Sequence, residues 1–235
     1  MVPVMKVDIL SLFPGMFDGP LRESLLGRAI ETGLIDVRVH DIRDHSSDRH
    51  RQVDDYSFGG GPGMVMKPEP IFSAVEALGD GAKRVVLLSA AGKHLDQRLV
   101  AELAAEPWLV LICGRYEGVD ERVVTGLPAE EISVGDFVLA GGEVAALVVL
   151  EAVSRLIPGV VGNEESLEPE SFQSGLLDHP HYTRPRVFRG MEVPDVLLSG
   201  DHQRIAEWRR QAAEEKTRKN RPDLLERFEE PKPGE

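Results

Sequence analysis

Short apolar runs alternate with stretches of helical spacing along most of the chain, and this alternation limits the fold more than any other feature. Residues 4–12, 84–89 and 108–113 are mainly apolar and rich in branched side chains. Strands that are apolar on both faces are typical of a parallel sheet covered by helices on each side. Residues 17–32, with apolar positions at helical spacing, are typical of the helices between them. The sequence therefore predicts a mostly parallel, two-sided α/β sheet.

Two connections, residues 41–66 and 158–178, show no periodicity and are too long for ordinary linkers, which indicates a functional or disordered segment. Beyond the second connection, Ile205 and Trp208 form the apolar face of a short helix, which predicts a small helical module on a tether. The remaining predicted elements are strands at 34–40 and 132–134 and helices at 69–78, 95–105, 120–125, 144–157, 201–211 and 221–228.

Two loops combine glycines with carboxylates where apolar runs end. They are residues 113–122, CGRYEGVDER, and residues 132–143, ISVGDFVLAGGE. Glycine lets the backbone approach a ligand closely and adopt positive φ, and ligands of open α/β sheets bind beyond the carboxyl ends of the strands. The two loops together indicate a nucleoside-like ligand held mostly by main chain, with acidic groups nearby. For either loop alone, a tight turn in an ordinary α/β domain is the alternative.

The composition excludes several protein classes. The chain is 42% hydrophobic and 29% charged, as is usual for a soluble protein with a sizeable core. The longest apolar stretch, residues 144–153, is too short to span a bilayer, and the N-terminus lacks the pattern of a secretory signal. The single cysteine, Cys113, excludes an internal disulfide and fits a reducing compartment. We therefore expect a cytoplasmic protein without a membrane partner, with Cys113 as a small buried residue.

A net negative charge argues against a nucleic-acid partner, but the distribution of the charges along the chain weakens this argument. The formal net charge is −13, but residues 201–235 hold equal numbers of basic and acidic side chains, so the excess lies in the first 200 residues. Residues 216–221 (KTRKNR) carry four cations and no anion, and residues 38–51 mix arginines and histidines with aspartates. Each run alone is typical of a solvated face. Together they could bind phosphates, although the rest of the protein is acidic.

Several common motifs are missing. The glycines of residues 59–63 lack the lysine and hydroxyl of a P-loop, and neither a dinucleotide fingerprint nor a nucleophile elbow is present. His179 and His181, joined by His45 or His50, could bind zinc, but the intervals match no standard finger and no thiolate is near. The sequence thus predicts no metal ligands.

Nine blocks of sequence occur in the order found in one known family. The blocks are SLFPGMF (11–17), DRHRQVDD (48–55), GGGPGM (59–64), LLSAAGKHLDQ (87–97), CGRYEGVDER (113–122), ISVGDFVLAGGE (132–143), SRLIPGVVG (154–162), GLLDHPHYTRP (175–185) and GMEVPDVLLSGDH (190–202). From about residue 5 to its tail, the chain resembles the bacterial tRNA (guanine-37-N1)-methyltransferases of the SPOUT superfamily.

The resemblance implies three parts. Residues 1–160 would form a trefoil-knotted, mostly parallel α/β domain that binds S-adenosylmethionine, residues 161–178 a flexible linker, and residues 179–235 a small helical domain that binds tRNA. The resemblance also implies a homodimer whose active site is shared across the interface. Because knots are nearly absent from proteins, pattern reasoning alone would not predict one.

The resemblance places S-adenosylmethionine among residues 88–92, 114–118 and 133–142. The backbone of residues 134–139 would hold the adenine and ribose, and carboxylates would attract the cationic sulfonium in a site shielded from water. Asp178 of the partner subunit would contribute likewise. The implied cofactor residues are Leu88, Ser89, Gly114, Tyr116, Glu117, Gly118, Ser133, Val134, Gly135, Asp136, Phe137, Val138, Leu139, Gly141, Gly142 and Asp178.

Methylation of guanine N1 requires a base that removes the N1 proton and a cation or donor that stabilises negative charge on O6. The resemblance assigns the O6 cation to Arg155 and the base to Glu170, where the family has an aspartate. Glutamate is chemically competent, but its extra methylene moves the carboxylate by roughly 1 Å. Glu168 is the alternative base if the register of the linker differs.

The resemblance also places RNA contacts on both basic runs. Asp54 and the glycines of residues 59–61, Gly59 among them, would read the target guanine. Ala90 departs from the family, which has a proline there, and the loop loses rigidity but no chemical group.

The family is reported to need magnesium, but no dense carboxylate cage is evident in the sequence. Two alternatives stay open: a SPOUT methyltransferase acting on another RNA site, and an RNA-binding relative without catalysis. The implied phosphate contacts are His50, Arg51, Lys216, Arg218 and Lys219.

Overall fold

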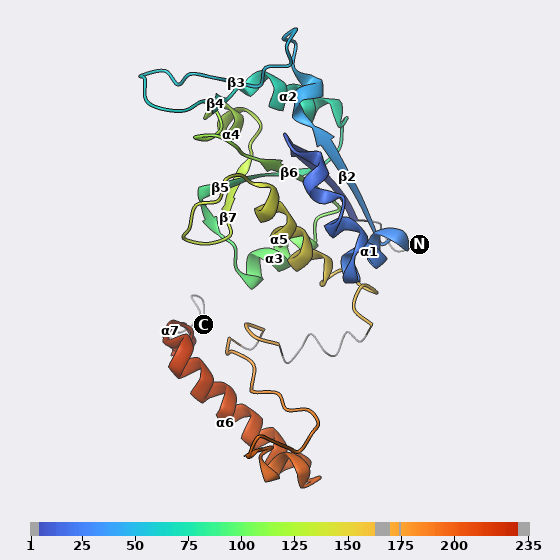
Figure 1. Ribbon diagram of the computed structural model, residues 1–235, viewed down its shortest axis with the longest axis vertical. Coiled ribbons are helices and arrows are strands. Elements are labelled where there is room, and N and C mark those ends of the chain that lie inside the picture. The colour runs from blue at the N-terminus through green and yellow to red at the C-terminus, as the bar shows by residue number, and fades with distance from the viewer. Residues whose placement is uncertain (1–4, 163–169, 174, 230–235) are drawn as a thin grey trace. The chain divides into compact units, whose positions relative to one another are not determined.

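The computed structural model describes residues 5–162, 170–173 and 175–229, and it divides the chain into two compact units, residues 1–162 and 163–235. Each unit has its own elements (Figure 1). The first unit holds a five-stranded sheet and its covering helices, and the second holds a short hairpin and two helices. The functional roles given above to the parts of the chain stay predictions.

The sheet of the first unit is parallel throughout, as predicted. Its strands lie in the order β2-β1-β6-β5-β7. The three runs that are apolar on both faces form its three central strands, which are the positions covered by helices on each side. The strand bounds are β1 Met5–Ser11, β2 Ile35–Asp41, β5 Arg84–His94, β6 Trp108–Cys113 and β7 Glu130–Ser133.

Alternate side chains of each central strand enter two separate cores. In β1, Val7 and Ile9 pack on the face covered by α1 (Ser24–Glu31), α3 (Gln97–Ala104) and α5 (Glu143–Ser154), and Leu10 packs on the opposite face. This alternation follows from the two-residue period of a strand. The opposite face is covered by α2 (Pro68–Ala77) and α4 (Arg122–Gly126).

A buried carboxylate interrupts the apolar side chains of β1. Asp8 is 1% exposed and forms hydrogen bonds with His40 (2.6 Å) and with the indole N–H of Trp108 (2.7 Å), while Lys6 Nζ lies 3.2 Å away. Burial raises the pKa of Asp8, but the hydrogen bonds from His40, Trp108 and Lys6 outweigh it, so the pKa lies below its ordinary value. The three partners satisfy a charge that would otherwise be costly to bury.

Three sequence predictions of element bounds were wrong. The helix expected over residues 17–32 is instead two 3₁₀ turns followed by α1, because Pro20 lacks the N–H that a continuous helix needs. Strand β5 continues five residues beyond Ser89, through an irregularity after Leu88, because it pairs again with β7. The helix expected to end at Gln211 runs on to Asn220, through residues that are mostly good helix formers. The 3₁₀ turns are η1, Pro14–Phe17, and η2, Pro20–Arg22.

The long connection between β2 and α2 is partly ordered, which the sequence did not predict. A 3₁₀ turn, η3 (Ile42–His45), follows β2 directly, and β3 (Asp54–Asp55) pairs antiparallel with β4 (Val65–Met66). The glycine-rich residues 59–63 therefore lie at the end of a short hairpin.

The second unit is built around α6 (His202–Asn220), which is followed by α7 (Pro222–Glu229). Asp201 caps α6 by accepting hydrogen bonds from the N–H groups of the first turn, a stabilising N-terminal arrangement. The buried Thr217 hydroxyl accepts a hydrogen bond from the Leu177 N–H (2.9 Å), which fixes the preceding segment to α6. The other elements are β8 (Val187–Phe188), β9 (Met191–Glu192) and the 3₁₀ turn η5 (Asp195–Leu198).

Candidate functional site

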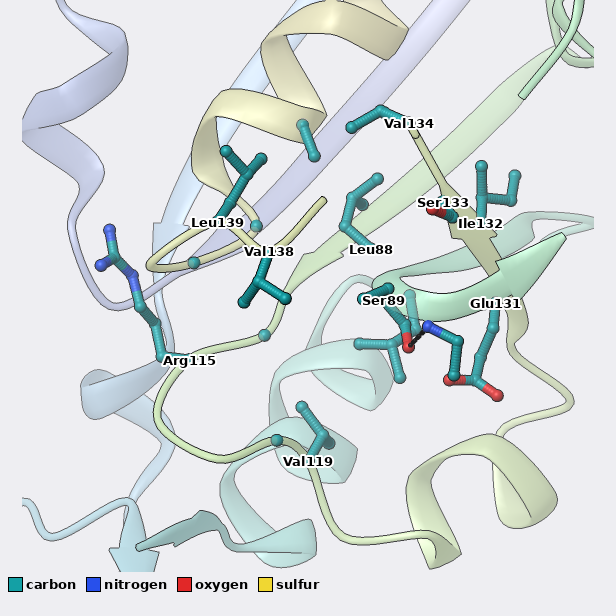
Figure 2. A pocket seen from close by; sticks show the side chains of 18 of the residues that line it. Leu88, Ser89, Arg115, Val119, Glu131, Ile132, Ser133, Val134, Val138 and Leu139 are labelled. Carbon is teal, nitrogen blue, oxygen red and sulfur yellow. Dashed lines mark hydrogen bonds between the residues drawn. The ribbon is translucent and has the colours of Figure 1, made fainter. Parts of the chain in front are cut away.

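A pocket of about 360 Å³ lies at the carboxyl ends of β6 and β7 and beside the irregularity after Leu88 in β5 (Figure 2). It is formed by residues 87–91, 114–119, 131–135 and 137–142 and closed by the start of α5. Parallel strands bring their carboxyl ends to one edge of a sheet, so loops far apart in sequence meet there. The volume lies within the range of small-molecule sites.

The pocket gathers most of the residues that the resemblance assigns to a cofactor. Asp136 is exposed in the loop of residues 133–142 and lies outside the lining, and Asp178 belongs to the second unit. The chemical role of each residue stays a prediction. Those in the lining are Leu88, Ser89, Gly114, Tyr116, Glu117, Gly118, Ser133, Val134, Gly135, Phe137, Val138, Leu139, Gly141 and Gly142.

Apolar side chains form much of the pocket wall. Leu88 comes from β5, and Val138 and Leu139 come from the loop after β7; Figure 2 shows the three around one part of the cavity. Ser89 and Glu131 lie at another part of the lining. An apolar surface with a few polar groups is typical of sites for nucleoside-like ligands.

Gly142 is required by a backbone contact between two of the loops. Its N–H donates to the Gly114 carbonyl (2.8 Å), and a Cβ on Gly142 would lie 2.8 Å from the Cα of Cys113. Because the obstructing atoms are backbone, no side-chain movement could relieve the clash. The glycine that sequence reasoning assigned to close approach thus joins the loop after β6 to the start of α5.

An ion pair beside the pocket was missed by sequence reasoning. Arg115 Nε donates to Glu143 Oε2 (2.8 Å), and the Ser11 hydroxyl donates to Glu143 Oε1 (2.8 Å). Glu143 is fully buried at the first turn of α5, where a negative charge is favoured by the helix dipole. Arg115 also donates to the Ala140 carbonyl (3.1 Å). The network ties β1, the loop after β6 and α5 together behind the pocket.

The glycine-rich hairpin packs against the pocket loop after β6. The Glu117 N–H donates to the Met64 carbonyl (3.0 Å), and the Met66 N–H donates to the Gly118 carbonyl (2.9 Å). A Cβ on Gly63 would lie 2.3 Å from the Glu117 side chain. The segment expected to read a base and the segment expected to hold a cofactor are therefore direct neighbours in the first unit.

Tyr116 connects these two segments. Its backbone has φ of +60°, which is unusual for a bulky residue and marks local strain. Partial burial raises the pKa of the Tyr116 hydroxyl, and the nearby Asp54 carboxylate raises it further, while Arg43 opposes both. Asp54 thus lies beside a residue that lines the pocket.

The cysteine at the end of β6 is a buried residue, as predicted. Burial raises the pKa of the Cys113 thiol well above its ordinary value, and the Glu143 charge adds to the effect. A thiol in this state is a poor nucleophile.

The predicted RNA contacts lie in both units. His50 and Gly59 are exposed, and Arg51 forms an ion pair with Asp44. Their part in binding RNA stays a prediction. At the end of α6, Arg218 and Lys219 are exposed and Lys216 is half-buried.

The two predicted catalytic residues also belong to different units. Arg155 is the C-terminal cap residue of α5, and Glu170 is a half-buried residue of the second unit. Glu168, the alternative base, lies outside the described residues. The prediction that Arg155 and Glu170 act in the same reaction is not tested by their positions.

Comparisons with known proteins identify the family. The sequence profile described as tRNA (Guanine-1)-methyltransferase TrmD matches residues 5–227. The chain belongs to this tRNA (guanine-1)-methyltransferase family. Its membership confirms the expected SPOUT-class α/β fold, while the knot stays a prediction. Among the described residues, no helix is both long and apolar enough to cross a membrane.

Curated relatives in the family are similar along nearly their whole length. A tRNA (guanine-N(1)-)-methyltransferase of Geotalea uraniireducens is 56% identical, over 94% of this chain and 90% of the relative. Relatives with the same name from Dictyoglomus turgidum and Geobacillus kaustophilus are each 53% identical, over 95% of this chain and 91% and 93% of their own lengths.

Proposed function

We propose that the chain is a tRNA (guanine-N1)-methyltransferase that uses S-adenosylmethionine and modifies guanosine 37, the base 3′ of the anticodon. The pocket formed by β5 and the loops after β6 and β7 is the observation that carries this proposal, because these segments contain blocks of sequence that resemble the family. A cytoplasmic location follows from a tRNA substrate.

The pocket residues fit the proposed methyl donor. Leu88, Val138 and Leu139 offer an apolar surface for an adenine ring, and the backbone of residues 134–139 offers polar groups for its edge. The Glu117 carboxylate, also in the lining, is an acidic group suited to a sulfonium, since a nearby negative charge attracts a cation. S-adenosylmethionine supplies an electrophilic methyl group when bound.

We assign the proton transfer to Glu170 and the charge stabilisation to Arg155. The Glu170 carboxylate would take the N1 proton, which leaves N1 able to accept the methyl group that the bound donor would supply. Negative charge that develops on O6 is stabilised by the Arg155 guanidinium. Asp54 and Gly59 read the guanine edge beside the pocket loop, and positioning of this kind can supply about 7–11 kcal/mol of the barrier.

We propose further that the enzyme is a homodimer with a shared active site. Helix α5 is apolar almost all round, yet Val144 and Val148 remain nearly half exposed in the single chain. Phe137 is 56% exposed and Val138 is 88% exposed in the neighbouring loop. A helix that is apolar on every side belongs in a buried environment, and an exposed apolar patch favours an interface. In this arrangement Asp178 of the partner subunit lies beside the methionine part of the cofactor.

Labelled methyl transfer tests the reaction. The enzyme is incubated with methyl-labelled S-adenosylmethionine and a tRNA transcript carrying guanosines at positions 36 and 37, and the product is digested to nucleosides. We expect label in 1-methylguanosine, and none with a matched transcript carrying adenosine at position 37. Label in another nucleoside would indicate a methyltransferase with a different target. Binding of cofactor and tRNA without transfer would indicate an RNA-binding relative that has lost catalysis.

A further inference from the structure

Three side chains of metal-ligand type converge in the second unit. Asp178, His179 and His181 place ligand atoms within 4.8 Å of one another. His179 Nδ1 lies 2.6 Å from Asp178 Oδ1, and His181 Nε2 lies 2.8 Å from Asp178 Oδ2. The two imidazole rings, with centroids 4.5 Å apart, thus hold one nitrogen each against the same carboxylate.

The surrounding structure fixes this cluster in place. The Asp178 N–H donates to the Ser171 hydroxyl (2.9 Å), and the preceding residue is tied to the buried Thr217 of α6. The His179 ring meets the edge of Trp208 at 6.5 Å between centroids, and its side chain is only 14% exposed. Two of the three ligand residues are therefore half-buried on a segment anchored to the helix, which favours a preorganised site.

The cluster combines two imidazoles with one carboxylate, a set that suits Zn²⁺ and other transition ions rather than Mg²⁺. Tetrahedral zinc with bonds of about 2.0–2.1 Å separates its ligand atoms by about 3.3 Å. The three ligand atoms of the cluster lie within 4.8 Å of one another, so zinc binding needs shifts of no more than about 1.5 Å between them. The His181 side chain is 70% exposed, which leaves an approach for the ion and for a water molecule.

We propose that Asp178, His179 and His181 form a Zn²⁺ site with an open fourth position for water. The ion replaces the hydrogen bonds between the imidazoles and the carboxylate and is held by His179 Nδ1, His181 Nε2 and an oxygen of Asp178. This site is separate from the sequence expectation, which joined the two histidines to His45 or His50 and found no suitable spacing.

Zinc titration of the full chain tests the site. Untagged protein is stripped with a chelator, desalted and titrated with Zn²⁺ against a chromophoric competitor, without cofactor or tRNA. We expect one equivalent per chain, and Co²⁺ in place of Zn²⁺ should give the visible absorption of a tetrahedral centre. Because no cofactor is present, failure of zinc binding leaves the proposed methyl transfer untouched.

Single substitutions locate the ion. His181→Ala and Asp178→Asn should each weaken zinc binding by at least about tenfold, while His202→Ala, which removes an exposed histidine of the same unit, should leave it unchanged. The mostly exposed His181 can be removed without opening the core, so His181→Ala keeps the test valid even if Asp178→Asn unfolds. Zinc binding that is absent in the wild type, or unaltered by His181→Ala, overturns the proposal.

Discussion

Replacement of Glu143 by alanine should destabilise the α/β unit more than any surface charge change. The substitution removes a fully buried carboxylate that accepts hydrogen bonds from Arg115 and Ser11. The Arg115 guanidinium would then stay near the core without its counter-charge, and the Ser11 hydroxyl would lose its acceptor. The pocket loop after β6 would also lose its link to α5.

The structure sets the size of the effect. Removal of one partner from a buried ion pair costs about 3–5 kcal/mol. The Arg115 side chain is 17% exposed and keeps its bond to the Ala140 carbonyl, so we expect the low end, about 3 kcal/mol. Glu102→Ala is the matched control, since Glu102 is 42% exposed and pairs with Arg98 on the helix surface. Its loss should cost at most about 0.5 kcal/mol.

Urea unfolding measures the difference. In a Trp208→Phe background, the fluorescence of Trp108 reports the first unit alone, because these are the two tryptophans of the chain and Trp108 lies in β6. The free energy of unfolding is compared among the background protein, Glu143→Ala and Glu102→Ala. A cost for Glu143→Ala below about 1 kcal/mol, or equal to that of the control, would refute the role assigned to the buried pair.

Three further predictions concern pH, thiol chemistry and catalysis. Because the folded-state pKa of Asp8 is lowered, its charge stabilises the fold above the unfolded-state pKa, and this stabilisation is lost as pH falls through the folded-state value. Asp8→Asn should therefore be less stable than the wild type by about 1–3 kcal/mol at pH 7, with a gap that narrows in acid; urea titrations that show a constant gap from pH 7 to pH 3 would contradict this. Cys113 should resist a thiol reagent at pH 8 and react once in urea, whereas rapid labelling of the native protein would show that the thiol is accessible. Glu170→Gln and Arg155→Ala should each abolish methyl transfer in single-turnover assays but bind S-adenosylmethionine nearly as the wild type does; loss of cofactor binding in both would show that their roles are misassigned.

The parallel sheet could be predicted because its central strands are apolar on both faces. That pattern depends only on local sequence and on the two-residue period of a strand. The continuation of β5 to His94 could not be predicted in this way, because residues 90–94 are not an apolar run and their strand conformation depends on pairing with β7. The length of α6 was missed although residues 211–216 favour helix, because the apolar positions that indicated the helix end at Trp208.

The candidate site was predictable from two sources of different strength. Glycines and carboxylates after apolar strands indicated a ligand site at the strand ends, since parallel strands finish at one edge. The individual residues, and the roles of Arg155 and Glu170, came from resemblance to a family. The Arg115–Glu143 pair came from neither source, because contacts between residues 28 positions apart depend on how the loops meet. The local sign was a carboxylate at the start of a mostly apolar helix.

A crystal structure with a bound, non-reactive S-adenosylmethionine analogue tests the central claim most directly. We predict that the adenine lies against Leu88 and the backbone of residues 134–139, with the methionine part near Glu117 of the same chain and Asp178 of a second copy. An analogue bound outside the pocket formed by β5 and the loops after β6 and β7 would contradict the account.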